Sequence, residues 1–321
     1  MRVIRHLAGR AGPVGRAVLT LGNFDGVHLG HQAILGRAVA RARELGGQAV
    51  ALTFEPHPLA VLAPERAPAI IQPMRDRLAL LRDLGVDVAI LQRFTRGFAA
   101  LDPEPFVRDF VLRHLELLHV VVGYNVNFGR NRAGSGETLR TLGMHLGFGV
   151  EVVGPVAAPG DEPGEEVSST RLRELLQRGD MRGARRLLGR PYALRGRVIV
   201  GDRRGRTLGF PTANLHLRPR LLMPPDGVYA VSVEGEGATY PGVLNIGVRP
   251  TFGGRRRTVE VHLLDFTGDL YRRWLVVRLI ERLRGETAFA APDALRAAIA
   301  ADIATARRVL AGDAALAPRA D

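Results

Sequence analysis

The first half of the chain alternates short, continuous apolar runs with longer segments in which apolar residues recur every three or four positions. Continuous runs predict buried strands of a parallel sheet, and the spaced pattern predicts helices that cover it. The predicted strands span 17–21, 48–54, 86–91, 119–122 and 149–153, and the predicted helices span 32–45, 73–84, 103–113 and 137–145. Pro56 and Pro58, which follow the second of these strands, predict a stiff loop. This alternation predicts a parallel α/β sheet wound by right-handed crossovers.

The pattern changes in the second half. Residues 155–166 are rich in Pro, Gly and acidic residues, which predicts a mobile surface loop, and two helical segments follow, one after Ser168 and one over 181–188. From Tyr192 onward, short β-favouring segments are separated by Gly, Pro and Asp clusters, which predicts an antiparallel barrel or sandwich. These segments span 195–200, 227–233, 239–246, 258–264 and 274–279. A helix over 292–310 follows, and the Ala-rich tail after Asp313 is expected to be disordered. The break at Gly189-Arg190-Pro191 predicts two domains, 1–188 and 189–321.

The first predicted strand and helix are joined by Gly22-Asn23-Phe24-Asp25-Gly26-Val27-His28-Leu29-Gly30-His31. Unpaired N–H groups and the helix dipole at the start of a helix favour an anion. His28 and His31 are three residues apart, so both imidazoles can face the same point. The segment therefore predicts a phosphate-binding turn that needs no lysine.

Two other interpretations of this turn are open. It could be a plain Asn-Phe-Asp-Gly turn with two unrelated histidines. Alternatively, Asp25, His28 and His31 could bind a metal such as zinc, because the His-x-x-His spacing suits it. The position at the carboxyl end of a predicted strand, where open α/β sheets bind ligands, favours the phosphate interpretation.

The amino-acid composition limits which kinds of catalytic and binding site the chain can form. The chain has no cysteine, which excludes disulfides, Cys-zinc sites and thiol catalysis and agrees with a reducing cytoplasm. All 45 Lys and Arg residues are arginine, so Schiff-base chemistry and a P-loop lysine are excluded. The net charge of +13 raises the possibility of nucleic-acid binding, but the arginines are dispersed, so nucleic acid is not the expected main partner. The sequence has no signal-peptide pattern and no apolar run of transmembrane length, so we expect a soluble, cytoplasmic protein without membrane contacts.

A second group of candidate residues lies in the β-rich half. Thr212 and Asn214 are two positions apart in an extended segment, so both point the same way and offer oxygen ligands that suit Mg²⁺. On the predicted strand 258–264, Val259, Val261 and Leu263 form the apolar face, and Glu260 and His262 point the other way. An exposed glutamate without a catalytic role is the commoner case on a strand.

Both halves resemble known enzymes. Gly-x-Phe-Asp-Gly-x-His-x-Gly-His is similar to the signature of nucleotidyltransferases, and Leu208 to Asn214, Pro225 to Tyr229, Asn245-Ile246-Gly247, Glu260 to Leu263 and Asp265 to Tyr271 resemble riboflavin kinase. From Gly22 to Arg308 the chain resembles the bacterial bifunctional riboflavin kinase/FAD synthetase. The resemblance implies a Rossmann-like nucleotidyltransferase domain and a β-barrel kinase domain. It further implies ATP, riboflavin, FMN and FAD as substrates or products, with Mg²⁺ as cofactor.

The resemblance also implies roles for individual residues. In the first domain, Gly22, Asp25, His28 and His31 would bind ATP, with further phosphate contacts from Ser168, Ser169, Thr170, Arg171 and Arg173. Phe54, Pro58 and Phe128 would hold the isoalloxazine ring, and Asn125 would orient the reacting phosphates of the flavin substrate and ATP. In the second domain, Thr212 and Asn214 would place Mg²⁺ and ATP, and Glu260 would be the base for the ribityl hydroxyl.

The sequence departs from the family at two positions. The family more often has arginine where Asn127 stands, although Arg130 or Arg132 could make that phosphate contact, and it usually has glycine where Arg272 stands. Two rival functions are open: a nucleotidyltransferase for another acceptor with a regulatory barrel, and an RNA-binding protein with an arginine-rich barrel. The oligomeric state, including transient self-association, is also open.

Overall fold

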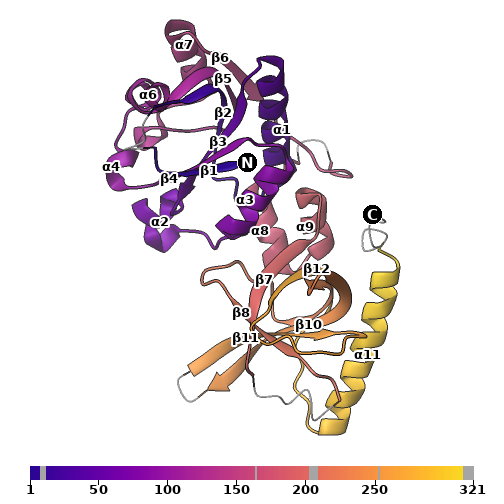
Figure 1. The fold of residues 1–321 in the computed structure, drawn as a ribbon. Helices are drawn as coiled ribbons and strands as arrows, with labels where there is room; N and C mark the ends of the chain where they lie inside the picture. Colours follow the sequence, from indigo (N-terminus) through magenta and orange to yellow (C-terminus); the bar gives the residue numbers. More distant parts are fainter. Residues whose placement is uncertain (8–11, 163–164, 202–208, 252–253, 314–321) are drawn as a thin grey trace. The chain divides into compact units, whose positions relative to one another are not determined.

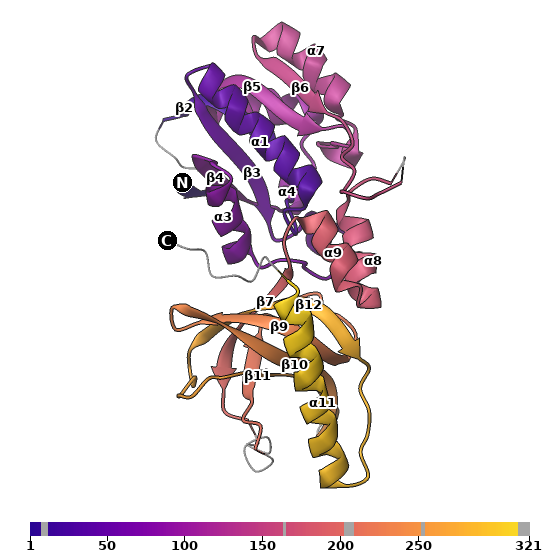
Figure 2. The ribbon, with the colours of Figure 1, turned by 90° about the vertical axis from the view of Figure 1, so that its right-hand side faces the viewer.

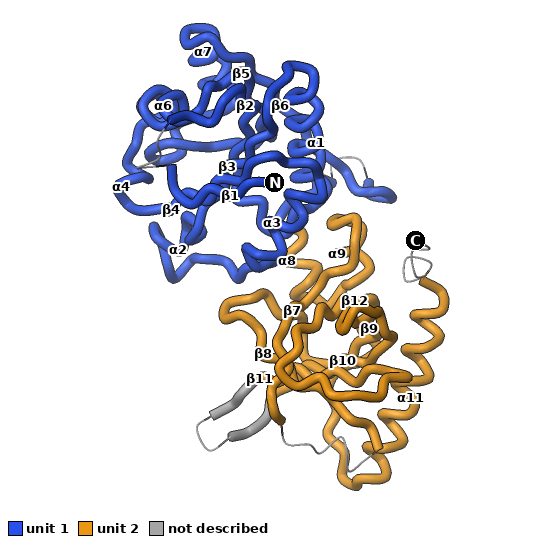
Figure 3. Tube along the Cα trace, in the orientation of Figure 1, with its two compact units in different colours: residues 1–169 blue, residues 170–321 orange. Residues whose placement is uncertain are grey.

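The computed structural model describes residues 1–7, 12–162, 165–201, 209–251 and 254–313 (Figure 1, turned by 90° in Figure 2). The chain forms two compact units, Met1–Ser169 and Thr170–Asp321 (Figure 3). Each unit has a hydrophobic cluster of its own. Within the described ranges, no helix has both the length and the apolar character needed to cross a bilayer.

The first unit is built on a six-stranded sheet in the order β1-β4-β3-β2-β5-β6, and all of its pairings are parallel. The strands are β1 (Arg2–Arg5), β2 (Val14–Leu21), β3 (Gln48–Glu55), β4 (Val88–Arg93), β5 (Leu115–Gly123) and β6 (Gly149–Val153). This confirms the predicted parallel α/β fold. The edge strand β1 was not predicted, because only Ile4 among its residues is buried and no apolar run marks it.

Helices cover both faces of this sheet. On one face lie α1 (Leu29–Glu44) and α3 (Met74–Asp83), whose Leu35 and Leu81 pack with Ala51 and Ala89 of the sheet (Figure 2). On the other face lie α7 (Gly136–Leu146) and a helical segment over 103–114. That segment consists of α5 (Pro103–Pro105), the π-helical η2 (Phe106–Val111) and α6 (Leu112–His114). The short elements α2 (Pro58–Leu62), η1 (Pro64–Arg66), α4 (Arg96–Ala99) and η3 (Arg130–Arg132) lie in the connections.

Two local predictions need correction. Helix α1 begins at Leu29 rather than at residue 32, because His28 acts as its N-cap. The segment with Pro56 and Pro58 was predicted as a stiff loop, but Pro58 is the first residue of α2, capped by His57. Proline suits this position because the first N–H of a helix has no internal partner.

The second unit contains a closed barrel in the order β10-β11-β8-β7-β12-β9, which confirms the barrel alternative. Its strands are β7 (Tyr192–Ile199), β8 (Ala213–Leu217), β9 (Gly227–Gly235), β10 (Ala238–Thr251), β11 (Gly254–Leu263) and β12 (Trp274–Arg284). Strand β8 pairs with β7 at four residue positions but with β11 at only two, Glu260↔Asn214 and Val261↔Ala213. The C-terminal helix α11 (Pro292–Ala311) packs Ala306 and Leu310 against Val243 and neighbouring residues of the barrel (Figure 1).

Two helices precede the barrel: α8 (Ser169–Arg178), which begins on the last residue of the first unit, and α9 (Met181–Leu188). Arg182 of α9 pairs with Glu281 of β12 at 2.5 Å. The domain boundary after residue 188 stays a prediction, whereas the compact second unit starts at Thr170. Leu208 of the quoted motif, residues 163–164 of the predicted loop and residues 314–321 of the predicted tail lie outside the described residues.

Candidate functional site

Three predicted site segments leave the carboxyl ends of neighbouring strands in the first unit. The order β3-β2-β5 brings together the turn after β2, the segment around Pro58 after β3 and the segment around Asn125 after β5. The chain runs from β2 to β3 on one side, while β5 lies on the other side of β2. This reversal of strand order is where open α/β sheets bind ligands.

The two histidines of the turn lie together. The Nδ1 atom of His28 accepts a hydrogen bond of 3.3 Å from the backbone N–H of His31. The two rings are stacked with centroids 3.7 Å apart, and Phe24 meets the His31 ring edge-on at 5.4 Å. In the neutral form of His28, an Nδ1 atom that accepts a hydrogen bond places the ring proton on Nε2.

The backbone of the turn is strained. Phe24 has a φ of 48° and Val27 a φ of 41°, values that cost a side chain about 1–3 kcal/mol. Both residues are buried, and the amide of Gln32 donates 2.8 Å to the carbonyl of Val27. Gly30 is closely surrounded, because a Cβ there would lie 3.3 Å from the His28 ring and 3.4 Å from the carbonyl of Val167. Packing therefore holds the turn in one conformation.

Asp25, an expected ATP ligand, points into the protein. Only 3% of the residue is exposed, and its carboxylate accepts hydrogen bonds from the backbone N–H groups of Ile71 and Gln72 at 3.1 and 3.0 Å. It also pairs with Arg77 at 3.0 Å. Within the described part of the chain, no three His, Cys, Asp or Glu side chains could hold a metal, which argues against the zinc alternative.

The expected flavin-ring residues Phe54 and Phe128 belong to one aromatic cluster. Phe98 contacts Phe54 at 5.9 Å and Phe106 at 5.9 Å, and Phe106 contacts Phe128 at 5.5 Å between ring centroids. Phe94 and Phe110 extend the cluster, the latter only 5.0 Å from Phe98. The sequence indicated the two ends of this chain of rings but not Phe98, which connects them.

The segment after β5 carries exposed polar groups. Asn125 is exposed, and the side-chain amide of Asn127 donates a 2.8 Å hydrogen bond to the backbone carbonyl of Asn125. Arg130, one candidate to replace the missing arginine, pairs with Asp102 at 2.9 Å, whereas Arg132 is exposed. Tyr124 donates a hydrogen bond to Glu166, which, with burial, raises the pKa of that tyrosine. This contact ties the end of the predicted 155–166 loop to the segment that follows β5.

The Ser/Thr/Arg segment spans the boundary between the units. The Ser169 hydroxyl donates a 3.2 Å hydrogen bond to the carbonyl of Asp25, so Ser169 contacts the turn that carries His28 and His31, and Ser168 precedes it in the same unit. Thr170, Arg171 and Arg173 belong to α8 in the second unit.

The barrel brings its predicted residues together. The Thr212 hydroxyl lies 3.3 Å from a carboxylate oxygen of Glu260 and donates to it. Glu260 pairs directly with Asn214 on β8 and with Asn245 on β10. Directly paired residues of antiparallel strands share a face, so an amide side chain flanks the carboxylate on each side. Asn245, near the end of the β-favouring segment predicted over 239–246, lies on strand β10.

Arg272, the departure from glycine, has a φ of 65°. Its N–H donates 3.0 Å to the carbonyl of Val198, and its own carbonyl accepts from Arg197 at 3.1 Å. The turn therefore keeps its hydrogen bonds with a side chain in the left-handed region, where L residues other than glycine are strained.

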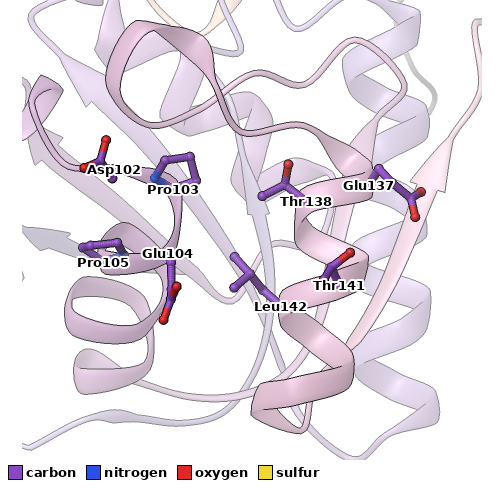
Figure 4. Close-up of a pocket in the computed structure, with 8 residues that line it drawn as sticks. All are labelled: Asp102, Pro103, Glu104, Pro105, Glu137, Thr138, Thr141 and Leu142. Carbon is purple, nitrogen blue, oxygen red and sulfur yellow. The ribbon is translucent and has the colours of Figure 1, made fainter.

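An open pocket of about 710 Å³ lies elsewhere in the first unit, between the start of α5 and α7 (Figure 4). Its lining residues are Asp102, Pro103, Glu104, Pro105, Glu137, Thr138, Thr141 and Leu142. None of the predicted site residues lines it. Its three carboxylates each pair with an arginine, Asp102 with Arg130, Glu104 with Arg108 and Glu137 with Arg140, and we do not assign ATP to this pocket.

Sequence reasoning missed Arg77, although a signal was present. Along α3, Arg77 falls between Met74 and Leu81 on the buried face of an otherwise periodic helix. An arginine on the apolar face of a helix predicts a buried partner, here Asp25.

Comparisons with known proteins cover both units. Residues 13–171 match the family model described as FAD synthetase, and residues 188–310 match the model described as riboflavin kinase. Curated relatives named bifunctional riboflavin kinase/FMN adenylyltransferase include a protein of Escherichia coli (strain K12), 43% identical over 96% of this chain and 97% of its own. A Pseudomonas fluorescens relative of the same name is 43% identical over 97% of this chain and 98% of its own, and one from Bacillus subtilis is 38% identical over 85% and 86%.

A solved structure with the same overall fold is titled as a macrolide-efflux protein from Streptococcus pneumoniae. It is 32% identical, has a TM-score of 0.85 and covers 96% of this chain and 99% of its own.

Proposed function

Because this chain belongs to the family of bifunctional riboflavin kinase/FMN adenylyltransferases, we propose that its two reactions run at separate sites, one in each compact unit. The enzyme phosphorylates riboflavin with ATP to give FMN and then transfers the adenylyl group of a second ATP to FMN, which yields FAD and pyrophosphate. The observation that carries the two-site proposal is that His28 and Glu260 lie in units with separate hydrophobic clusters.

In the adenylylation site, His28 and His31 bind the ATP phosphates at the start of α1. Their stacked rings, the Nε2 proton of His28 and the helix N-terminus together favour an anion. Gly22, Ser168 and Ser169 support the same phosphates. The contacts expected from Thr170, Arg171 and Arg173 stay a prediction, since these residues belong to the second unit. We assign Asp25 to the shape of the turn, since its carboxylate already accepts three internal hydrogen bonds.

The flavin lies against Phe54, Pro58 and Phe128, and Asn125 orients the reacting phosphates. The FMN phosphate oxygen attacks the α-phosphorus of ATP, the new P–O bond forms, and the bond to pyrophosphate breaks. The displacement is direct, so no covalent intermediate with the protein is needed. The site has to position the two phosphates and stabilise the negative charge on them.

In the kinase site, Glu260 accepts the proton of the terminal ribityl hydroxyl while that oxygen attacks the γ-phosphorus of ATP and ADP leaves. Thr212 and Asn214 would hold Mg²⁺ there, because hydroxyl and amide oxygens beside a carboxylate are the ligands this ion prefers. When bound, Mg²⁺ neutralises phosphate charge. The Thr212 hydroxyl and the flanking Asn214 and Asn245 orient the Glu260 carboxylate.

The test measures each reaction on full-length protein with Mg²⁺ and ATP, starting from riboflavin or from FMN, with products separated by chromatography. Glu260→Gln keeps the shape and removes the base, so FMN formation should fall about 10²- to 10⁴-fold while FAD formation from FMN stays within about threefold. His28→Ala should lower FAD formation by about 3 kcal/mol of transition-state stabilisation and leave the kinase step unchanged.

Matched controls are Glu234→Gln, which removes a barrel carboxylate paired with Arg278, and His145→Ala, which removes an exposed histidine of α7. Both should leave both reactions intact. Loss of both reactions in Glu260→Gln would mean that the two halves share one active site.

We also propose that the partners of this protein are small molecules, that it works in the cytoplasm, and that nucleic acid and membranes are not partners. The dispersed arginines support this, since many of them pair with acidic neighbours, as Arg43 does with Asp87 and Arg307 with Asp265. Salt-sensitive RNA binding without ATP turnover would instead support the RNA-binding rival.

A further inference from the structure

Arg77 is a buried arginine beneath the phosphate-binding turn. It belongs to α3, and its side chain is 7% exposed, beside the 4% exposed side chain of Asp25. A buried ion pair adds little stability over apolar residues of similar size, because both charges lose their hydration. Its presence therefore calls for a reason other than stability.

The contacts of the Arg77 guanidinium supply such a reason. One terminal nitrogen donates to the carbonyl of Asn23 at 2.6 Å, and the other donates to Asp25 at 3.0 Å and to the carbonyl of Gln72 at 3.2 Å. Asp25 in turn accepts from the backbone of Ile71 and Gln72. One planar group thus joins the turn, the 71–72 segment and α3.

Asn23 extends this network toward the flavin side. Its carbonyl also accepts a 3.1 Å hydrogen bond from Thr53, at the end of β3. Its side-chain amide lies 3.3 Å from Nε2 of His57. His57 caps α2, whose first residue is Pro58, because its Nδ1 accepts from the N–H of Leu59 at 3.2 Å. The residue that Arg77 fixes therefore contacts both the histidine turn and the segment assigned to the flavin ring.

We propose that Arg77 is a positioning residue for adenylyl transfer, which holds Asn23 and Asp25 so that the histidine turn and the His57–Pro58 segment keep one relative placement. This rests on the assignment of the turn to ATP and of Pro58 to the flavin. Lysine is not an equivalent replacement, because the three bonds leave two separate nitrogens of a planar group and an ammonium has only one nitrogen. Misplacement by about 1 Å can cost about 10²-fold in rate, so the effect should fall on kcat.

The experiment compares Arg77→Lys with wild type in steady-state FAD formation from FMN, at a temperature where circular dichroism shows the variant folded. We expect kcat to fall about tenfold or more, with KM for ATP changed by less than about threefold. The kinase step of the same molecules serves as an internal control. Arg82→Lys is the matched control, because Arg82 lies on the same helix, is 62% exposed and pairs only locally with Asp83.

If Arg77→Lys does not fold, Asp25→Asn/Arg77→Gln removes both buried charges and makes the same comparison. A kcat within about twofold of wild type in the folded variant overturns the proposal, because a merely structural arginine would change stability alone. His28→Ala, measured in parallel, separates the two claims. If it slows FAD formation and the Arg77 variant does not, only the positioning role fails; if neither variant slows it, the assignment of the turn fails.

Discussion

Phe98→Leu tests whether the aromatic cluster acts as a unit. Leucine keeps most of the apolar volume of Phe98 but removes its ring contacts with Phe54, Phe94, Phe106 and Phe110, at centroid distances of 5.9, 5.8, 5.9 and 5.0 Å. Each such pair contributes about 0.5–1.5 kcal/mol beyond area burial. The four contacts share one ring and are not additive, so we expect a loss near the low end of their sum, about 2 kcal/mol.

For a unit of this size, about 2 kcal/mol corresponds to a fall in Tm of about 4–8 °C. Far-UV circular dichroism follows both units, whereas the single tryptophan, Trp274, lies in the second unit and reports on the barrel alone. Only the thermal unfolding transition of the first unit should shift to a lower Tm. Phe148→Leu is the comparison variant, since Phe148, at 6% exposed, is more deeply buried than Phe98 and makes no ring contact with the other described residues.

KM for FMN in FAD formation should also rise in Phe98→Leu, because Phe98 contacts Phe54, the residue assigned to the flavin ring. Equal destabilisation by Phe98→Leu and Phe148→Leu would refute the reasoning, because it would mean that ordinary burial accounts for the whole effect.

Three further predictions concern stability. Arg272→Gly should stabilise the barrel by about 0.5–1 kcal/mol, measured by urea unfolding with Trp274 fluorescence, because glycine relieves a φ of 65°; a net loss would contradict this. Gly149→Ala should destabilise the first unit by about 1–3 kcal/mol, since its Cβ would lie 2.2 Å from the His119 ring, while Gly154→Ala, with no atom within 4 Å, should be neutral. The hydrogen bond from Arg43 lowers the pKa of Asp87, so its stabilisation is complete above the unfolded pKa of about 3.9 and disappears as pH falls through the folded pKa. The stability difference between wild type and Asp87→Asn should therefore shrink in acid, and an undiminished difference at about pH 2 would exclude the ionised pair as its cause.

The elements of the fold follow closely from the sequence where one physical signal dominates. Uninterrupted apolar runs locate β2 to β6, and the broken periodicity after residue 189 predicts the barrel. Edge strand β1 has one buried residue and carries no such signal. The start of α1 was misplaced because a histidine, rather than a usual Ser, Thr, Asp or Asn, caps it.

The candidate site could be predicted only in part from the sequence, because some of its contacts join residues that are far apart in the chain. His28 and His31 are close in the chain, so helical spacing alone predicts their contact. Arg77 and Asp25 are 52 residues apart, and Phe98 and Phe54 meet only through the fold. A sequence indicates which residues are chemically able to act, but the partners that orient them depend on tertiary contacts.

The short pairing of β8 with β11 has a consequence for local opening of the barrel. The wall closes there on two residue pairs, and one of the four residues involved is Glu260. Amide protons at this seam should exchange with solvent through local opening, well below the free energy of global unfolding. A nucleotide held by Thr212 and Asn214 on one side and facing Glu260 on the other would bridge the seam. Substrate binding at the proposed kinase site would then slow amide exchange at this junction, so protection there would report directly on ligand binding.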